Sequence, residues 1–224
     1  MRSLKIAFQL AIMVLPWALR RRLLVKVFGF DIHPTARIGK SVLLPRKLRM
    51  AEHSRIGSLT FGHGMEEIRL DAHAILGSMN WISGFPLGGA RYFRDFPDRH
   101  PMLHLEEHAT IVNRNLIDCT DRVTVGRFAL VAGNRNQILT HGIDMRTSNQ
   151  SSAPVRIGAY SMVGTGSILL KGSALPDYCA LGAGSTLHKN HSQTHMLYSG
   201  VPAEPVRALD PGLSFFSRTQ GTSD

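Results

Sequence analysis

The sequence predicts an all-β protein, a left-handed parallel β-helix assembled from six-residue repeats. Aliphatic residues recur at every sixth position late in the chain, namely at Ile157, Val163, Leu169, Leu175, Leu181 and Leu187. Glycine follows three of them directly. A period of six fits neither an α-helix, with 3.6 residues per turn, nor a strand, with a period of two. Hexapeptide periods are typical of parallel β-helices, and this repeat is the left-handed exception to the right-handed rule for parallel crossovers.

The first element that we expect is a pair of short amphipathic helices within residues 1–29. Apolar residues recur at helical spacing from Leu4 to Leu15, and Pro16 should separate the two helices. The apolar run of residues 6–19 is shorter than the about 20 residues that span a bilayer. Arginines follow this run where a signal peptide would carry its cleavage site, which disfavours a signal peptide.

The charge of the chain is concentrated in the same region. The net charge is +10, and residues 1–50 hold eleven Lys or Arg but a single acid, Asp31, whereas the remainder holds fifteen charges of each sign. A basic and apolar segment of residues 1–29 is typical of helices that lie on an anionic membrane surface, with Trp17 and Phe28 as anchors. The alternative is that the helices only cap the β-helix. No nucleic-acid recognition motif is present, so we exclude a nucleic-acid partner.

The β-helix itself is expected over residues 30–190, with a C-terminal tail over residues 191–224. The hexad register begins at Ile32 and is interrupted twice, by residues 83–102 and by the polar, turn-like residues 142–154. Three hexads make one triangular coil, with the aliphatic side chain inward, and each coil leans on its neighbours. The flat sides of such a prism favour a homotrimer.

The composition is that of a folded protein from a reducing compartment. The chain is 43% hydrophobic and 19% charged, which is sufficient for a packed core. Its two cysteines, Cys119 and Cys179, cannot form a disulfide framework, and we interpret them as small, reduced core residues. We therefore expect a cytoplasmic protein, held at the inner face of the plasma membrane by its first helices.

Three segments carry a resemblance to a known family. Residues 125–144, 155–190 and 197–209 resemble the hexapeptide-repeat acyltransferases, and above all the sugar O-acetyltransferases of bacterial surface-polysaccharide pathways, of the colanic-acid type. The resemblance implies acetyl-CoA as donor, a sugar hydroxyl as acceptor, no metal, and direct transfer without a covalent enzyme intermediate. The basic N-terminus favours a lipid-linked or polymeric glycan acceptor, because membrane placement helps only when the substrate is there.

The resemblance places the catalytic base at His141, where a repeat block ends before an irregular segment. A sugar hydroxyl is a weak nucleophile, so a base whose pKa lies near working pH must take its proton. Asp144 is a candidate for orienting the imidazole ring, although a backbone carbonyl would serve equally well. Asn113 and Asn115 lie upstream and are candidates for holding the acceptor.

The resemblance also assigns a coenzyme A groove, between two subunits along the last coils. Small residues there let the backbone approach the pantetheine arm, and basic residues can meet the phosphates. The predicted contacts are Gly164, Thr165, Ala183, Gly184, Ser185, Lys189 and Arg207. The family often has threonine before the lysine, whereas this chain has His188, and residues 200–203 supply the family's Gly-x-Pro-Ala turn.

The insertion of residues 83–102 combines aromatic and arginine side chains, at Arg91, Tyr92, Phe93, Arg94 and Phe96. Such a set suits a sugar bearing a phosphate or a lipid pyrophosphate, and it suits a contact between subunits equally well.

Three other functions remain open from the sequence. An N-acetyltransferase of a nucleotide-linked amino sugar would use the same base and coenzyme. A zinc carbonic anhydrase of the hexapeptide class needs three converging histidines, whereas the histidines here, at 100, 104 and 108 and at 191 and 195, have spacings that suit a helix face. An inert scaffold would tolerate the loss of His141.

Overall fold

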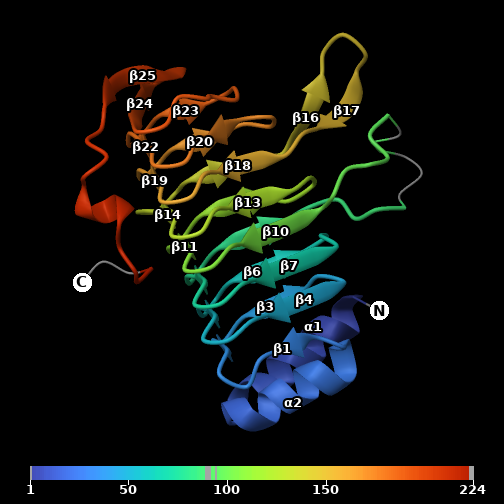
Figure 1. Ribbon diagram of the computed structural model, residues 1–224. Helices are drawn as coiled ribbons and strands as arrows, with labels where there is room; N and C mark the ends of the chain where they lie inside the picture. The colour runs from blue at the N-terminus through green and yellow to red at the C-terminus, as the bar shows by residue number, and fades with distance from the viewer. Residues whose placement is uncertain (1, 89–91, 94, 222–224) are drawn as a thin grey trace.

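The computed structural model describes residues 2–88, 92–93 and 95–221. It confirms the predicted class, because the chain winds into a prism of three parallel sheets with two helices at one end (Figure 1). Arg91 and Arg94, two of the side chains expected to contact either a substrate or another subunit, lie outside the described residues.

The N-terminal helices are α1 (Arg2–Ala11), continued by the short 3-10 turn η1 (Ile12–Val14), and α2 (Trp17–Phe28). Pro16 precedes α2 and separates the helices, as its fixed backbone angle and missing N–H require. Gly29 ends α2 in the left-handed region, and its N–H donates to the carbonyl of Val25.

Each coil contributes one strand to each of three sheets. The first sheet holds β1 (Asp31–Ile32), β4 (Lys47–Met50), β7 (Glu67–Leu70), β10 (Met102–Leu105), β13 (Val123–Val125), β18 (Val155–Ile157) and β21 (Ala174–Leu175). The second holds β2 (Arg37–Ile38), β5 (Arg55–Ile56), β8 (Ile75–Leu76), β11 (Thr110–Ile111), β14 (Leu130–Val131), β19 (Met162–Val163), β22 (Ala180–Leu181), β24 (Met196–Gly200) and β25 (Ala203–Ala208). The third holds β3 (Val42–Leu44), β6 (Phe61–His63), β9 (Trp81–Ser83), β12 (Leu116–Asp118), β15 (Gln137–Ile138), β20 (Ile168–Leu169) and β23 (Thr186–Leu187).

Inward side chains at the hexad positions fill the prism. The six aliphatic residues that reveal the period are each 0% exposed. Cys119 and Cys179 are buried and unpaired, as expected, and burial raises the pKa of both thiols. The core is thus a continuous aliphatic column along the prism axis.

We name the corners by the sheets that they join: the first corner joins the first and second sheets, the second corner joins the second and third, and the third corner joins the third and first. At the second corner, asparagines bridge the coils. Asn80 Oδ1 accepts the backbone N–H of Asn115, whose own Oδ1 accepts that of Asn136, at 2.9 and 3.0 Å. These amides satisfy buried backbone donors that the bend of the coil leaves without a strand partner.

The first corner carries a ladder of stacked rings, one from each of seven successive coils. Neighbouring centroids lie 4.6–5.4 Å apart, and every ring residue has a positive φ between 52° and 60°. The members of this ring ladder are His53, His73, His108, Phe128, Tyr160, Tyr178 and His195. After the 3-10 turn η2 (Ser214–Phe216), the tail runs along the ladder, where Phe216 sets its ring edge-on to Tyr178 and Arg218 donates to the Phe128 carbonyl.

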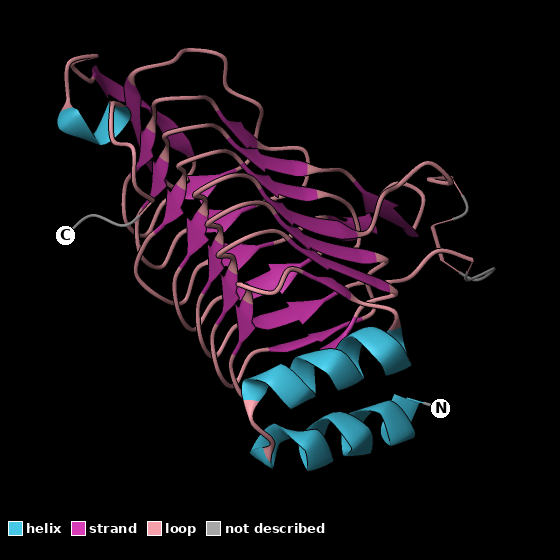
Figure 2. Cartoon of the chain, turned by 60° about the horizontal axis from the view of Figure 1, so that its bottom comes forward, coloured by secondary structure: helices cyan, strands magenta, loops and turns pink. Residues whose placement is uncertain are grey.

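The two helices close the open end of the first coil (Figure 2). Gln9 Nε2 donates to the Leu43 carbonyl at 2.6 Å, and Gln9 Oε1 accepts the Leu43 N–H at 3.0 Å. The Arg20 guanidinium donates to the carbonyls of residues 38, 39 and 41. The helices are therefore a cap, and the predicted anchors Trp17 and Phe28 pack against the core instead of projecting outward.

The C-terminal boundary differs from the one predicted at residue 190. Strand β24 pairs in parallel with β22, and Tyr198 takes an inward position with 1% exposure, so the stacking continues beyond Leu187. Strand β25 then folds back antiparallel on β24. The six-residue period does not predict β24, because an irregular segment replaces the hexads between Leu187 and this strand.

Candidate active site

Three consecutive coils depart from the repeat at the third corner. The coil of β9 leaves through an insertion, residues 84–101, before β10 begins. The coil of β12 turns through residues 119–122, and the coil of β15 leaves through a hairpin of β16 (His141–Asp144) and β17 (Asn149–Ser152). Residues 142–154, expected to be irregular, thus form a paired β-hairpin. The insertion and the hairpin project from the same side of the prism (Figure 1) and meet where Asn149 donates to Asp95 at 3.4 Å.

His141 stands at the base of this hairpin, paired with an acid from the coil before it. Its Nδ1 lies 2.6 Å from Oδ2 of Asp118, the last residue of β12. An ionised carboxylate can only accept, so Nδ1 carries the proton and Nε2 is left with a free lone pair. The His141 side chain is 30% exposed and that of Asp118 is 5% exposed, so the acid is buried behind a base that solvent can reach.

The buried carboxylate of Asp118 is fully satisfied. Its Oδ1 accepts from the backbone N–H and the hydroxyl of Thr120, at 3.1 and 2.6 Å. Its Oδ2 accepts from the backbone N–H groups of Thr140 and His141, at 2.8 and 3.0 Å. Burial alone would raise the pKa of Asp118, but the hydrogen bonds from His141, Thr120 and Thr140 outweigh it and hold that pKa below its ordinary value. Asp118 therefore remains an anion that fixes the ring and stabilises its protonated form.

Aromatic rings from the insertion line the exposed ring of His141. Phe85 and Phe93 approach it edge-on, with centroid distances of 5.4 and 6.0 Å. Phe93 is 5% exposed and Phe85 is 38% exposed. The insertion thus forms one wall beside the base.

Arg99 fastens this insertion to the prism. Its guanidinium donates to the carbonyls of Phe85 and Pro86 within the insertion and to that of Thr120 on the coil. It also lies over the ring of Phe93, 4.6 Å from the centroid. One buried cation therefore fixes the path of the insertion and the position of the aromatic wall.

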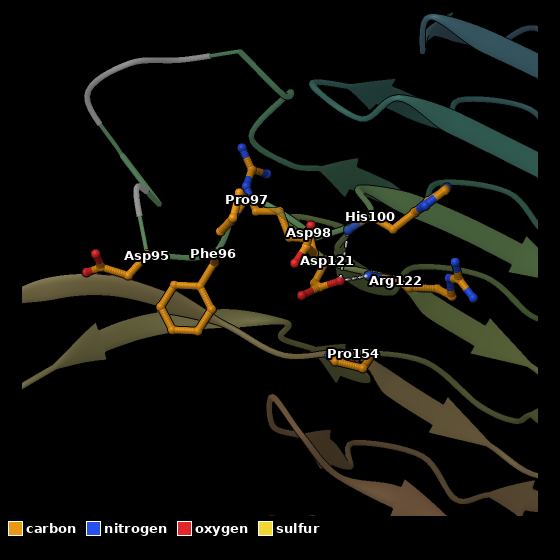
Figure 3. A pocket seen from close by; sticks show the side chains of 9 residues that line it. Asp95, Phe96, Pro97, Asp98, His100, Asp121, Arg122 and Pro154 are labelled. Carbon is orange, nitrogen blue, oxygen red and sulfur yellow. Dashed lines mark hydrogen bonds between the residues drawn. The ribbon is translucent and has the colours of Figure 1, made fainter.

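Asp121 binds both the insertion and the hairpin to the coil of β12. Its Oδ1 accepts the backbone N–H of His100, where the insertion returns, and its Oδ2 accepts the Ser152 hydroxyl, where the hairpin returns. Figure 3 shows this carboxylate inside a pocket of about 410 Å³, with Pro154 below and Phe96 at its outer edge. The coil of residues 118–122 therefore orients His141 through Asp118 and holds the insertion and the hairpin through Asp121.

A second cavity lies between the insertion and the hairpin. It measures about 580 Å³ and combines aromatic side chains with carboxylate, hydroxyl and amide groups. Its lining residues are Tyr92, Phe93, Asp95, Ile143, Ser148, Asn149 and Gln150. Phe93 lines this cavity and also packs edge-on against the His141 ring, so one aromatic side chain connects the cavity with His141.

Three predicted residues lie away from His141. The Asp144 carboxylate accepts the N–H of Arg146 within the hairpin, at 2.8 Å, so the prediction that it orients the ring is wrong and Asp118 takes that place. Asn113 and Asn115 lie at the second corner, at the other end of β12. Asn113 accepts the N–H of Ser78, and Asn115 is buried within the asparagine bridges, so neither reaches the base of its own chain. Backbone N–H groups at the corners of the coils need side-chain acceptors, and both asparagines serve as such acceptors.

The small residues predicted to approach coenzyme A lie together at the second corner. Gly164 packs directly against Ala183 of the next coil, with no room for a side chain between them. Thr165, Ala183 and Gly184 are exposed, but Ser185 is 1% exposed and its hydroxyl lies 3.3 Å from that of Ser199. Ser185 is therefore a structural residue, and its side chain is not available to a ligand.

The two predicted phosphate-binding cations lie at the same end of the prism. Lys189 Nζ pairs with the Glu204 carboxylate at 2.7 Å, and both side chains are about half exposed. Arg207 is exposed on β25. The ion pair at Lys189 is accessible to solvent, and such pairs contribute little, so an incoming phosphate could compete with Glu204.

The histidines do not converge on a metal site. Among the described residues, no group of three or more His, Cys, Asp or Glu side chains is placed to hold a metal ion. They also lie on no helix face: His104 is in β10, with Nε2 2.8 Å from Asp71, and His108 belongs to the ring ladder.

Sequence reasoning missed Asp118, Asp121 and Arg99. A signal was present, because residues 118–121 place two acids within four residues, directly after the inward position Ile117 of the hexad register. Arg99 has no comparable signal, since it lies in an insertion without register.

No protein-family model matches the sequence, and no curated protein matches it. Among solved structures, a variant of AntD, an N-acyltransferase from Bacillus cereus in complex with dTDP-4-amino-4,6-dideoxyglucose and coenzyme A, matches at 14% identity and a TM-score of 0.50, over 85% of this chain and 89% of that chain. A hexapeptide transferase family protein from Anaplasma phagocytophilum matches at 16% identity and a TM-score of 0.49, over 84% and 85%. A maltose O-acetyltransferase from Clostridium difficile 630 matches at 11% identity and a TM-score of 0.38, over 93% and 84%.

Proposed function

The AntD likeness establishes a shared hexapeptide β-helix fold, and from that fold and the site we propose that the chain is an acetyl-CoA-dependent O-acetyltransferase acting on a sugar hydroxyl. The observation that carries the proposal is the His141–Asp118 pair beside a polar and aromatic cavity. A buried acid, an oriented ring and a free Nε2 are what deprotonation of a weakly acidic hydroxyl requires.

In the proposed reaction, His141 Nε2 accepts the proton of the sugar hydroxyl while that oxygen attacks the acetyl carbonyl carbon. Asp118 stabilises the imidazolium that forms, because its carboxylate is already ionised and bound to Nδ1–H. His141 then returns the proton to the thiolate sulfur as the carbon–sulfur bond breaks. The products are an acetyl ester and the free thiol of coenzyme A.

The cavity between the insertion and the hairpin is our proposed acceptor site. The ring of Tyr92, which is 44% exposed, offers apolar surface to a sugar, and the amides of Asn149 and Gln150 offer hydrogen bonds to its hydroxyls. Bacterial surface polysaccharides and lipid-linked glycans are the acceptors that we propose.

Acetyl-CoA would supply the thioester, and exposed small residues at the second corner fit its narrow arm. Thr165, Ala183 and Gly184 are exposed there, and Lys189 and Arg207 are the cations that we propose for its phosphates. This corner and His141 lie at opposite edges of the third sheet. We therefore propose a homotrimer in which a neighbouring subunit brings the two surfaces together, and light scattering on the purified chain tests it.

Replacement of His141 tests the catalytic assignment. With acetyl-CoA and a panel of sugar acceptors, we expect His141→Asn to reduce turnover by about 10²- to 10⁴-fold while the fold is retained. The measurement is the release of free coenzyme A thiol together with mass spectrometry of the product. His33→Asn, an exposed histidine at the far end, is the matched control and should retain activity. Equal turnover by wild type and His141→Asn would exclude His141 as the base.

The AntD match favours one second candidate, an N-acetyltransferase of a nucleotide-linked amino sugar, since that structure is described with such a sugar. The product distinguishes the two, because hydroxylamine cleaves an acetyl ester and leaves an amide intact. Transfer to amino sugars alone would replace the O-acetyltransferase proposal.

A further inference from the structure

The N-terminal helix pair has an outer face that the cap does not use. On α1 and η1, the residues opposite Gln9 are apolar and exposed, with Leu4 at 75%, Leu10 at 52% and Val14 at 86%. Ala7 and Ala11 complete the same stripe and are also exposed. Spacings of three and four residues place them on one side of the helix, away from the prism.

The outer side of α2 adds charge to this stripe. Leu19 is 46% exposed and Val25 is 37% exposed, and Arg22 and Lys26 are exposed beside them. We call these residues of the two helices together the outer helix face. In Figure 2 both helices lie side by side across the end of the prism, so this face forms the end of the molecule.

The charge of this end is of one sign. Residues 2–30 contain six Lys or Arg and no acid. Arg20 and Arg21 donate to carbonyls of the first coils. The other four, Arg2, Lys5, Arg22 and Lys26, are exposed, and none forms an ion pair with any residue that the structure describes.

We propose that the outer helix face docks the protein on an anionic lipid surface. Exposed aliphatic side chains next to unpaired cations on an in-plane helix are the features that interfacial binding requires. No helix among the described residues has the length and apolarity needed to cross a bilayer, so the contact is interfacial. A protein partner fits less well, because the rings of Trp17 and Phe28 pack inward and the face offers no aromatic anchor.

Vesicle sedimentation with the full chain tests this proposal. Removing the helices would uncover the first coil, so substitutions on their outer side are the sharper tool. The wild-type chain should bind vesicles of phosphatidylcholine with phosphatidylglycerol more tightly than vesicles of phosphatidylcholine alone. The variant Leu4→Gln/Leu10→Gln/Val14→Gln should bind both at least about tenfold more weakly, since each side chain loses its apolar burial.

A charge variant separates the two contributions. Arg22→Gln/Lys26→Gln should weaken binding to the anionic vesicles by roughly tenfold and leave the weak binding to neutral vesicles unchanged. Val206→Gln removes a valine that is 59% exposed on β25, at the opposite end, and should bind as wild type does. Turnover on a water-soluble acceptor is measured in parallel and should be equal in all variants.

Two results would overturn the proposal. One is a wild-type chain that fails to bind anionic vesicles, or that binds them as well after the triple substitution. The other is a change in oligomeric state on the triple substitution, seen by light scattering without lipid, which would assign the face to a second copy of the chain.

Discussion

The first and third corners of the prism are built from the same coils and have opposite character. At the first corner, each of seven coils contributes one ring at an equivalent position, and the C-terminal tail covers much of the stack. At the third corner, three consecutive coils each do something different, and buried carboxylates replace the stacked rings. At the first corner the same ring contact is repeated from coil to coil and stabilises the stack. At the third corner the repeat is interrupted, and the segments that leave it surround His141.

The first and third corners also differ in the number of hydrogen bonds that their side chains form. The ring ladder needs few hydrogen bonds, because its contacts are ring faces at 4.6–5.4 Å. At the third corner, Asp118 and Asp121 are both buried, and each accepts hydrogen bonds from several donors. A buried charge is tolerated only with such partners, so the irregular corner is constrained as tightly as the regular one.

The largest effect that would sharpen this contrast is expected from Asp118→Asn. A carboxylate accepts through both oxygens, whereas the asparagine amide accepts only through its oxygen and donates through its NH2 group. The proton of the His141 ring would then no longer be fixed on Nδ1, and turnover should fall about 10²- to 10⁴-fold. Asp144→Asn, the acid nearest to His141 in sequence, should change turnover by less than about twofold. Nitrogen NMR of the His141 ring provides the second readout, and an unchanged tautomer in Asp118→Asn would contradict the positioning role.

The next effect belongs to the first corner. Tyr160→Ala should lower the free energy of unfolding by about 2–4 kcal/mol, because it interrupts the ladder between Phe128 and Tyr178. Tyr160→Gly should cost about 1 kcal/mol less than Tyr160→Ala, since φ at this position is 54° and glycine adopts that angle without strain. Urea titration measures both variants. A glycine variant less stable than the alanine variant would show that backbone strain at the ladder is unimportant.

A smaller effect, on binding of the acceptor, is expected from Arg99→Ala. The insertion would lose its carbonyl contacts and the aromatic wall its support, so KM for the acceptor should rise roughly tenfold with kcat reduced less. Arg46→Ala, whose side chain is 73% exposed, is the matched control and should leave both constants unchanged. An effect on kcat alone would place Arg99 with the chemistry and not with the wall.

The smallest effect is on acid stability. The pKa of Asp118 is held below its ordinary value, so its contribution to the free energy of unfolding is present above about pH 4 and is lost as the pH falls through the folded-state pKa. Asp118→Asn should flatten that part of the pH dependence, whereas Asp144→Asn should not. Urea midpoints measured between neutral pH and acid pH decide between these outcomes.

The sequence predicts the regular parts of this molecule well, because the repeat can be recognised from the six-residue spacing of aliphatic residues. Inward residues such as Leu169 and Leu181, the two helices and the break at Pro16 all follow from period and backbone chemistry. The site follows only in part. The family resemblance predicts His141. Its partner Asp118 lies on the preceding coil, 23 residues away in sequence, so proximity along the chain points to Asp144 instead.

The stacking of coils fixes the distance between the helix cap and His141. Parallel strands in one sheet lie about 4.8 Å apart, and four such steps separate β3, beside the helix cap, from β15, which leads to His141. With about 10 Å for the helix layer, His141 stands about 30 Å above the outer side of the helices. With the proposed docking and the proposed glycan acceptor, the prism would set how far from its lipid an acceptor must extend, and removing one whole coil would shorten that height by about 4.8 Å.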